Sequence, residues 1–177
     1  ETPKEGTVTI GDTIQIGYFS QDSRKMDENM RVIDYVKEVG EYVTTSDGKI
    51  TASQMLERFL FDGAMQWSKI EKLSGGEKRR LYLMRVLMSA PNVLILDEPT
   101  IAQDYPGKKR IGDMIASLSE NGKLVIAILH DMDFVAENFE RVIVMAHGTV
   151  LADGVPEEVF AQDEVLKKAR LQKPSMT

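Results

Sequence analysis

The middle of the chain constrains the fold most, because an amphipathic run there is followed by a short, wholly apolar one. Apolar residues recur at helical spacing over 77–89, which predicts a helix that buries one stripe. The run 92–96 is apolar after Asn92 and ends at the acid pair Asp97 and Glu98. Such a run is typical of a central parallel strand covered on both faces. The chain is therefore expected to contain an α/β core.

The same periodicities organise the rest of the chain. A second wholly apolar strand is expected over 123–129, and the order strand, helix, strand implies a right-handed crossover. Further helices are predicted over 30–40, 52–61, 106–118, 156–160 and 164–171, with antiparallel hairpins over 6–19 and 142–151, and a polar loop over 44–49. The predicted fold is a parallel sheet core with a helical subdomain and small antiparallel strands.

Composition narrows the class of protein. The 177 residues suit one domain, and 42% hydrophobic with 28% charged residues is ordinary for a globular protein. No cysteine occurs, which excludes disulfides and thiolate metal sites and favours a reducing cytoplasm. The longest apolar run, 124–129, is far shorter than the roughly 20 residues that span a bilayer. A net charge of -6 gives no footprint for generic nucleic-acid binding, and the basic clusters 78–80 and 108–110 are interpreted as solvated helix faces.

The four residues Ser74, Gly75, Gly76 and Glu77 precede or open the predicted central helix. Two glycines let the backbone approach an anion closely, the helix start offers unpaired N–H groups, and the serine hydroxyl adds a donor. This arrangement is suited to phosphate oxygens. An ordinary helix N-cap is the alternative interpretation.

Two acids and a histidine follow the two apolar strands. Asp97 is a candidate Mg²⁺ ligand, usually through water, and Glu98 could orient or deprotonate an attacking water. If the two strands are neighbours, His130 should lie near both acids, where a neutral imidazole could donate to a phosphate. A solvated acidic strand end and a structural histidine are the alternatives, and Gln21 alone would mean little.

A phosphate-binding loop of the form G-x-x-x-x-G-K-[ST] does not occur. The Gly-Lys pairs at 48–49, 107–108 and 122–123 lack both the following Ser or Thr and the earlier glycine. The sequence therefore carries half of a nucleotide site.

Taken together, these residues resemble the ATP-binding cassette (ABC) ATPases. The segment 73–77 matches the signature motif of that family, and 93–97 with Glu98 matches its Walker B strand and catalytic glutamate. Asp104 matches the D-loop aspartate, His130 the switch histidine and Gln21 the Q-loop glutamine. The resemblance covers nearly the whole chain and implies a P-loop NTPase-type fold.

The resemblance implies ATP and Mg²⁺ as cofactors and a second cassette, in a homo- or heterodimer, as a head-to-tail partner. The signature residues Ser74, Gly75, Gly76 and Glu77 would serve the partner's nucleotide, and Asp104 would link the two sites. Glu98, His130 and Gln21 would be catalytic on the chain's own ATP. Asp97, with Gln21, would serve its metal.

Two departures from the family pattern stand out. Only 20 residues precede Gln21, so the Walker A strand, loop and helix are expected to be missing and the chain to be a fragment that is inactive alone. The segment 101–103 keeps only Ala102 of the usual D-loop wording.

The expected division is a hairpin and Q-loop at 1–25, a helical subdomain with the signature at 26–89, and an α/β core with C-terminal helices at 90–177.

The two halves resemble different branches of the family. The segments 18–21 and 61–81 look like the soluble ABC-F proteins that act on ribosomes, whereas 130–137 and 153–160 look like ATPases of energy-coupling-factor importers. The leading hypothesis is an ATPase that couples dimer closure to transport through a membrane subunit, peripheral at the inner face of the membrane. Alternatives are an ABC-F-type ATPase that binds nucleic acid on ribosomes, or a non-catalytic fragment or chimera that donates only the signature.

Overall fold

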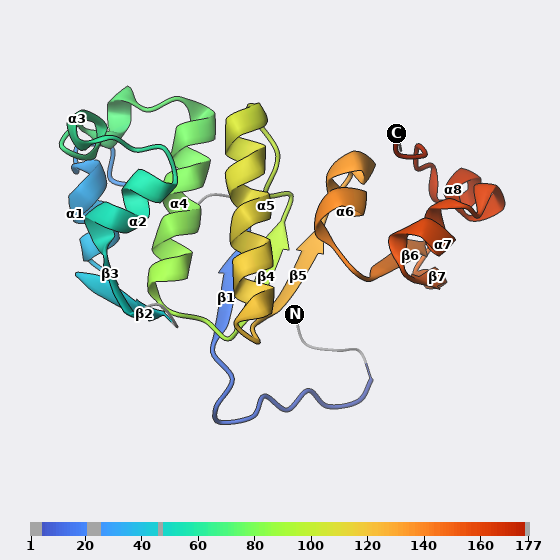
Figure 1. Cartoon of the computed structure of the whole chain (residues 1–177). Helices are drawn as coiled ribbons and strands as arrows, with labels where there is room; N and C mark the ends of the chain where they lie inside the picture. Colours follow the sequence, from blue (N-terminus) through green and yellow to red (C-terminus); the bar gives the residue numbers. More distant parts are fainter. Residues whose placement is uncertain (1–4, 21–25, 46–47, 176–177) are drawn as a thin grey trace.

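A three-stranded parallel sheet forms the centre of the computed structural model, which describes residues 5–20, 26–45 and 48–175 (Figure 1). Its strand order is β1 (Ile16–Phe19), β4 (Val93–Asp97) and β5 (Leu124–Ile128). Both apolar runs are thus parallel strands, as predicted, and Asp97 pairs with Ile128 at the carboxyl edge. The α/β fold class is confirmed.

Two helices lie side by side on one face of this sheet (Figure 1). α4 (Gly75–Met88) carries the predicted apolar stripe, and α5 (Tyr105–Glu120) connects β4 to β5. Phe19, Leu94 and Leu96 point to this side and are almost fully buried. Close approach is possible because β1 has Gly17 where a Cβ would meet Val86 and Pro91.

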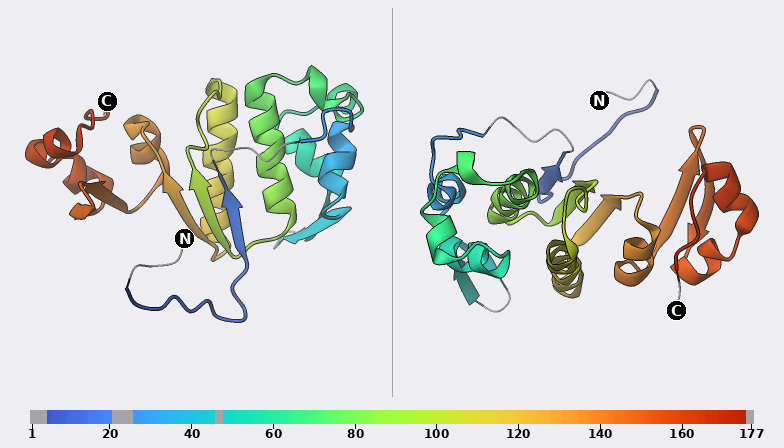
Figure 2. Two further views of the ribbon diagram at one scale, coloured as in Figure 1. Left: turned by 180° about the vertical axis from the view of Figure 1, so that it is seen from behind. Right: turned by 90° about the horizontal axis from the view of Figure 1, so that it is seen from above.

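The opposite face of the sheet is bare. Its side chains remain 46–54% exposed on the outer strands: Ile16, Tyr18, Leu124, Ile126 and Ile128. No element of the described residues covers this face, as the view from behind in Figure 2 shows. The expectation that the apolar strands are covered on both faces is therefore wrong for this structure, because helices are present on one side only.

The N-terminal segment also differs from expectation. Only Ile16–Phe19 of the predicted hairpin over 6–19 is a strand, and it pairs in parallel with β4. Asn92 explains the choice of partner, since its side chain accepts from Gln15 N (2.9 Å) and donates to Thr13 O (2.7 Å). Alternating apolar residues predict a strand but not the strand that it pairs with.

The helical subdomain packs against α4 and shares its core (Figure 1). It contains α1 (Val32–Lys37), α2 (Ala52–Arg58), α3 (Gly63–Gln66) and a 3₁₀ turn at Ile70–Lys72. The polar loop expected over 44–49 is instead part of a hairpin of β2 (Tyr42–Thr45) and β3 (Gly48–Thr51). Val43 and Ile50 pair on its buried side, a signal too short to distinguish from loop sequence.

The C-terminal part has a second, smaller core. It comprises α6 (Met132–Asn138), the predicted hairpin of β6 (Val142–Ala146) and β7 (Thr149–Gly154), and the predicted helices α7 (Pro156–Phe160) and α8 (Asp163–Ala169). His147 and Gly148 both have positive φ and form the turn, as expected. α6 was not predicted, although Asp131 caps it by accepting from Phe134 N. No helix among the described residues is long and apolar enough to cross a bilayer.

Candidate nucleotide site

The first turn of α4 is capped by side chains, and two of its backbone N–H groups remain open to an anion. Ser74 Oγ accepts from Glu77 N (3.3 Å), and Glu77 Oε2 accepts from Ser74 N (2.7 Å), which completes a capping box. The cap leaves the N–H groups of Gly75 and Gly76 without a hydrogen-bond partner among the described residues. The two interpretations made from sequence are therefore compatible: the side chains cap the helix, and two backbone donors remain for an anion.

The two glycines have different surroundings. A Cβ at Gly75 would meet nothing, whereas one at Gly76 would collide with the carbonyl oxygen of Ala102. Gln103 strengthens this contact, because its Nε2 donates to Gly76 O (3.0 Å). Its Oε1 accepts from Arg80 (3.0 Å). The segment 101–104 is thereby fixed against the first turns of α4.

Asp104 begins the next helix, where its carboxylate accepts from Gly107 N (3.0 Å) and lies 3.9 Å from Arg80. Its side chain is 68% exposed. The sequence assigns Asp104 an interface role, and within the chain it is the N-cap of α5.

The acid pair stands at the carboxyl edge of β4. Asp97 is half-buried, and Glu98 is buried with a φ of 51°. A positive φ is uncommon for a non-glycine residue and concentrates at functional sites. Glu98 N donates to Ile128 O (3.0 Å), so the neighbouring strand fixes the point at which the chain turns.

His130 lies beside Glu98, as the parallel arrangement of β4 and β5 predicts. Its Nε2 is 3.1 Å from Glu98 Oε1, with the imidazole 80% exposed and the carboxylate 8%. The approach does not have hydrogen-bonding geometry, so Glu98 Oε1 is a buried oxygen without a hydrogen bond among the described residues. Buried polar atoms of this kind are rare and call for a ligand or water.

These oxygens fit a magnesium ion held partly by other ligands. Among the described residues, no group of three or more His, Cys, Asp or Glu side chains could hold a metal. Mg²⁺ commonly takes one or two carboxylates and completes its shell with water and phosphate oxygens. The carboxylates of Asp97 and Glu98 match that donor set, since Glu98 Oε1 has no hydrogen bond among the described residues. Gln21, the other expected ligand, lies outside the described residues.

The basic cluster 78–80 is not the solvated face that the sequence suggested. Arg80 is buried, with its guanidinium 5.8 Å from the Phe61 ring. Arg79 is partly buried against the acid pair, and burial lowers the pKa of its guanidinium while Asp97 and Glu98 raise it. Sequence reasoning missed both side chains because helical periodicity counts apolar residues and not buried cations.

The profile of the family described as "ABC transporter" matches residues 1–101, more than half of the chain. The chain belongs to the ABC transporter family. The ABC transporter ATP-binding protein YfmR of Bacillus subtilis is 49% identical over 152 residues, 85% of this chain and 24% of that protein. The energy-coupling factor transporter ATP-binding protein EcfA2 of Methanospirillum hungatei is 41% identical over 102 residues, 58% of this chain and 26% of that protein.

Solved structures agree on the fold. The ATP-binding cassette MJ1267 in its ADP conformation has a TM-score of 0.68 at 21% identity, over 89% of this chain and 68% of that one. The dimeric cassette MJ0796 with ADP and Pi has a TM-score of 0.65 at 21% identity, over 81% and 63%. Compared with YfmR and EcfA2, the chain spans about a quarter of the length of each relative.

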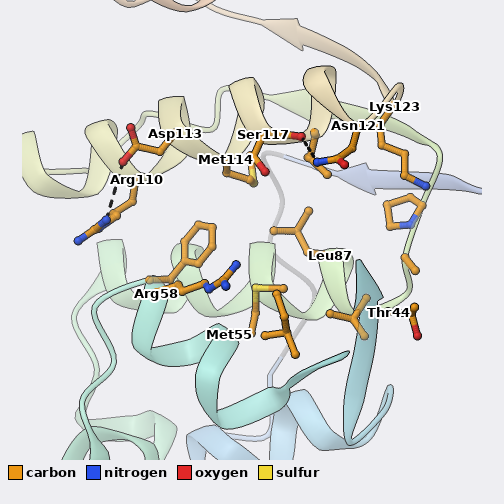
Figure 3. Close-up of a pocket in the computed structure, with 16 residues that line it drawn as sticks. Thr44, Met55, Arg58, Leu87, Arg110, Asp113, Met114, Ser117, Asn121 and Lys123 are labelled. Carbon is orange, nitrogen blue, oxygen red and sulfur yellow. Dashed lines mark hydrogen bonds and ion pairs between the residues drawn. The ribbon is translucent and has the colours of Figure 1, made fainter. Parts of the chain in front are cut away.

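A pocket among the described residues lies apart from Asp97 and Glu98. A groove of about 630 Å³ separates α2 from α5 and has Leu87 of α4 at its base (Figure 3). Met55 and Met114 face each other across it, with charged side chains at the rim: Arg58, Arg110, Asp113 and Lys123. The groove is not lined by Asp97, Glu98 or His130.

Proposed function

We propose that this chain is the signature-bearing and Walker B-bearing part of an ATP-hydrolysing ABC cassette. The observation that carries the proposal is Glu98, a buried carboxylate at the edge of the sheet whose Oε1 has no hydrogen bond among the described residues and lies 3.1 Å from His130 Nε2. A carboxylate so placed can orient a water or accept its proton. The imidazole of His130 can donate to a phosphate oxygen next to it.

The remaining roles follow the family resemblance. Asp97, together with Gln21, would hold Mg²⁺, and the ion would supply positive charge to the transferred phosphoryl group. Ser74, Gly75 and Gly76 offer their donors to nucleotide bound by a second cassette, with Glu77 fixing the cap. Asp104, 68% exposed next to that helix start, is available to the same partner. The division at residues 25 and 89 belongs to this proposal.

The bare sheet face supports a missing piece of the same fold. Five large apolar side chains stand half-exposed in one layer, and such a patch marks an interaction surface. We assign this face to the segment that carries Walker A. Without that loop of backbone donors and its lysine, residues 1–177 alone are expected to bind ATP weakly and to hydrolyse none.

The cassette would drive transport through a membrane subunit, bound by the helical subdomain at the inner face of the membrane. The similarity to EcfA2 and the groove beside α2 support this choice. A net charge of -6 does not favour the nucleic-acid surface that a ribosomal role requires.

ATP turnover of the longest product of the encoding gene tests the proposal. Glu98→Gln is expected to reduce turnover about 100-fold or more, because general-base catalysis contributes factors of that size. Glu120→Gln, an exposed carboxylate at the end of α5, is the matched control and should leave turnover unchanged. Full turnover in Glu98→Gln would refute the catalytic role of Glu98. Turnover by residues 1–177 alone that disappears in Glu98→Gln would instead overturn the expectation that this segment is inactive by itself.

A further inference from the structure

Three consecutive basic residues of α4 reach three different parts of the molecule. Lys78 pairs with Glu28 (2.6 Å), and Arg80 contacts Gln103 and Asp104. Arg79 instead donates through one terminal nitrogen to the carbonyl oxygens of Glu98 (2.9 Å) and Asp97 (3.4 Å). The helix that begins with the two glycines is therefore bonded directly to the backbone of the acid pair.

The position of the Glu98 carbonyl determines the direction of the Glu98 side chain. This carbonyl belongs to the residue whose φ is 51°, and it also accepts from Ile101 N (3.3 Å). A charged donor makes a stronger bond than the neutral amide. Any movement of Arg79 relative to β4 would consequently rotate the turn that carries the Glu98 side chain.

Arg79 also contacts the strand that leads to residue 21. Its guanidinium carbon lies 5.0 Å from the centre of the Phe19 ring, and that ring packs on Tyr82 of the same helix at 5.3 Å. Phe19 is 1% exposed, so it cannot move independently of the core. One guanidinium thus joins the ends of two strands to α4.

We propose that Arg79 is a positioning residue that transmits the position of the helix start at Ser74–Gly76 to the side chain of Glu98. The inference rests on the proposed function, in which the helix start faces nucleotide of a second cassette and Glu98 faces the chain's own. α4 is continuous from Gly75 through Arg79, so contact of its first turn with a phosphate is carried as a rigid-body shift. The geometry makes hydrolysis at one site sensitive to occupancy of the other.

The same helix provides a matched control. Arg85 also donates to a backbone carbonyl, Tyr35 O at 2.7 Å, and stacks on an aromatic ring, Tyr35 at 4.5 Å. Its contacts lie in the helical subdomain, away from the acids. Arg79→Met and Arg85→Met both remove a charge, a hydrogen bond to a backbone carbonyl and an aromatic contact from one helix, and Arg85→Met also removes an ion pair with Glu38 (2.6 Å).

Histidine NMR of residues 1–177 reads the position of Glu98 without nucleotide. The chain has two histidines, His130 beside Glu98 and His147 in the β6–β7 turn. Arg79→Met is expected to shift the ring resonances of His130 and leave those of His147 in place, and Arg79→Lys to restore part of the shift. Arg85→Met should leave both histidines unchanged. An unchanged His130 in Arg79→Met, or an equal shift in Arg85→Met, would overturn the proposal.

Turnover of the longest gene product gives the second readout. Arg79→Met is expected to lower kcat about 10- to 100-fold with KM for ATP unchanged, since small misplacement of a catalytic group has effects of this size. A change confined to KM would contradict a positioning role. Absence of ATP turnover in the unsubstituted protein would refute the proposed function, while the His130 spectrum would still decide whether Arg79 positions Glu98.

Discussion

The two faces of the central sheet differ in how completely the described residues bury their side chains. On the side that carries α4 and α5, Leu94 and Leu96 are almost fully buried, and the buried guanidinium of Arg80 donates to Gln103 (3.0 Å). On the other side, Ile126 and Ile128 are half-exposed. The helix side holds the fold together, and the bare side presents a surface on which further protein can pack.

Core truncation should show the largest difference between the two sides. Leu96→Ala, at a fully buried position, is expected to lower the free energy of unfolding by about 3 kcal/mol through lost burial and a cavity. Ile126→Ala, at 47% exposure on the adjacent strand, should cost less than about 1 kcal/mol. Chemical denaturation of residues 1–177 measures both.

Equal losses for the two variants would show that the bare face is covered in solution. In the longest gene product, by contrast, Ile126→Ala should become several times more costly if the Walker A segment packs there. An unchanged small cost in that longer protein would contradict our assignment of the bare face.

The apolar strands show what sequence can and cannot predict about a sheet. The runs 92–96 and 123–129 correctly predicted parallel strands, because such composition is adapted to burial on two sides. In the part of the chain that the structure describes, helices cover these strands on one side only. The strand with which residues 16–19 pair could not be predicted either. Asn92, whose side chain bonds the backbone just before that segment, is a single polar residue outside any periodic pattern.

The two glycines at the start of α4 allow the same comparison between a packed position and an open one. Gly76→Ala places a methyl group against Ala102 O and should destabilise the chain by about 1–3 kcal/mol, because backbone must shift to admit it. Gly75→Ala faces open space and should be neutral, or stabilising by about 0.5 kcal/mol through reduced freedom of the unfolded chain. Thermal unfolding of both variants measures the difference.

Ser89→Ala, at the C-cap of the same helix, controls for loss of a local hydrogen bond without overpacking. If Gly76→Ala proved as harmless as Gly75→Ala, segment 101–104 would not be fixed against α4, and the close contact would be wrong.

The sequence names candidate residues but not the contacts between them. Asp97, Glu98 and His130 are candidates because they follow parallel strands, whose carboxyl ends share an edge, and the structure does place His130 beside Glu98. Arg79 was missed because its contact with Glu98 O depends on how α4 sits against β4. That relation comes from packing of the entire subdomain, and no local pattern encodes it.

The smallest expected effect concerns a partly solvated ion pair on the helix side. Lys108 of α5 donates to Asp131 (2.6 Å), and this hydrogen bond, aided by Phe134 N, holds the pKa of the Asp131 carboxyl below its ordinary value of 3.8. A depressed carboxyl pKa stabilises the fold at pH above the unfolded value, and the contribution disappears as pH falls through the folded pKa. Because both side chains are partly exposed, the contribution should be below about 1 kcal/mol.

Asp131→Asn isolates this contribution, since asparagine can still cap α6 but carries no charge. The difference in unfolding free energy between the unsubstituted chain and Asp131→Asn should be constant from about pH 7 to 5 and shrink below about pH 4. Glu120→Gln, exposed on α5, should show no such pH dependence. A difference that persists undiminished to about pH 2 would mean that it does not come from the charge of Asp131. The ion pair would then contribute nothing to holding the His130 segment against α5, leaving that segment fixed only by β5 and α6.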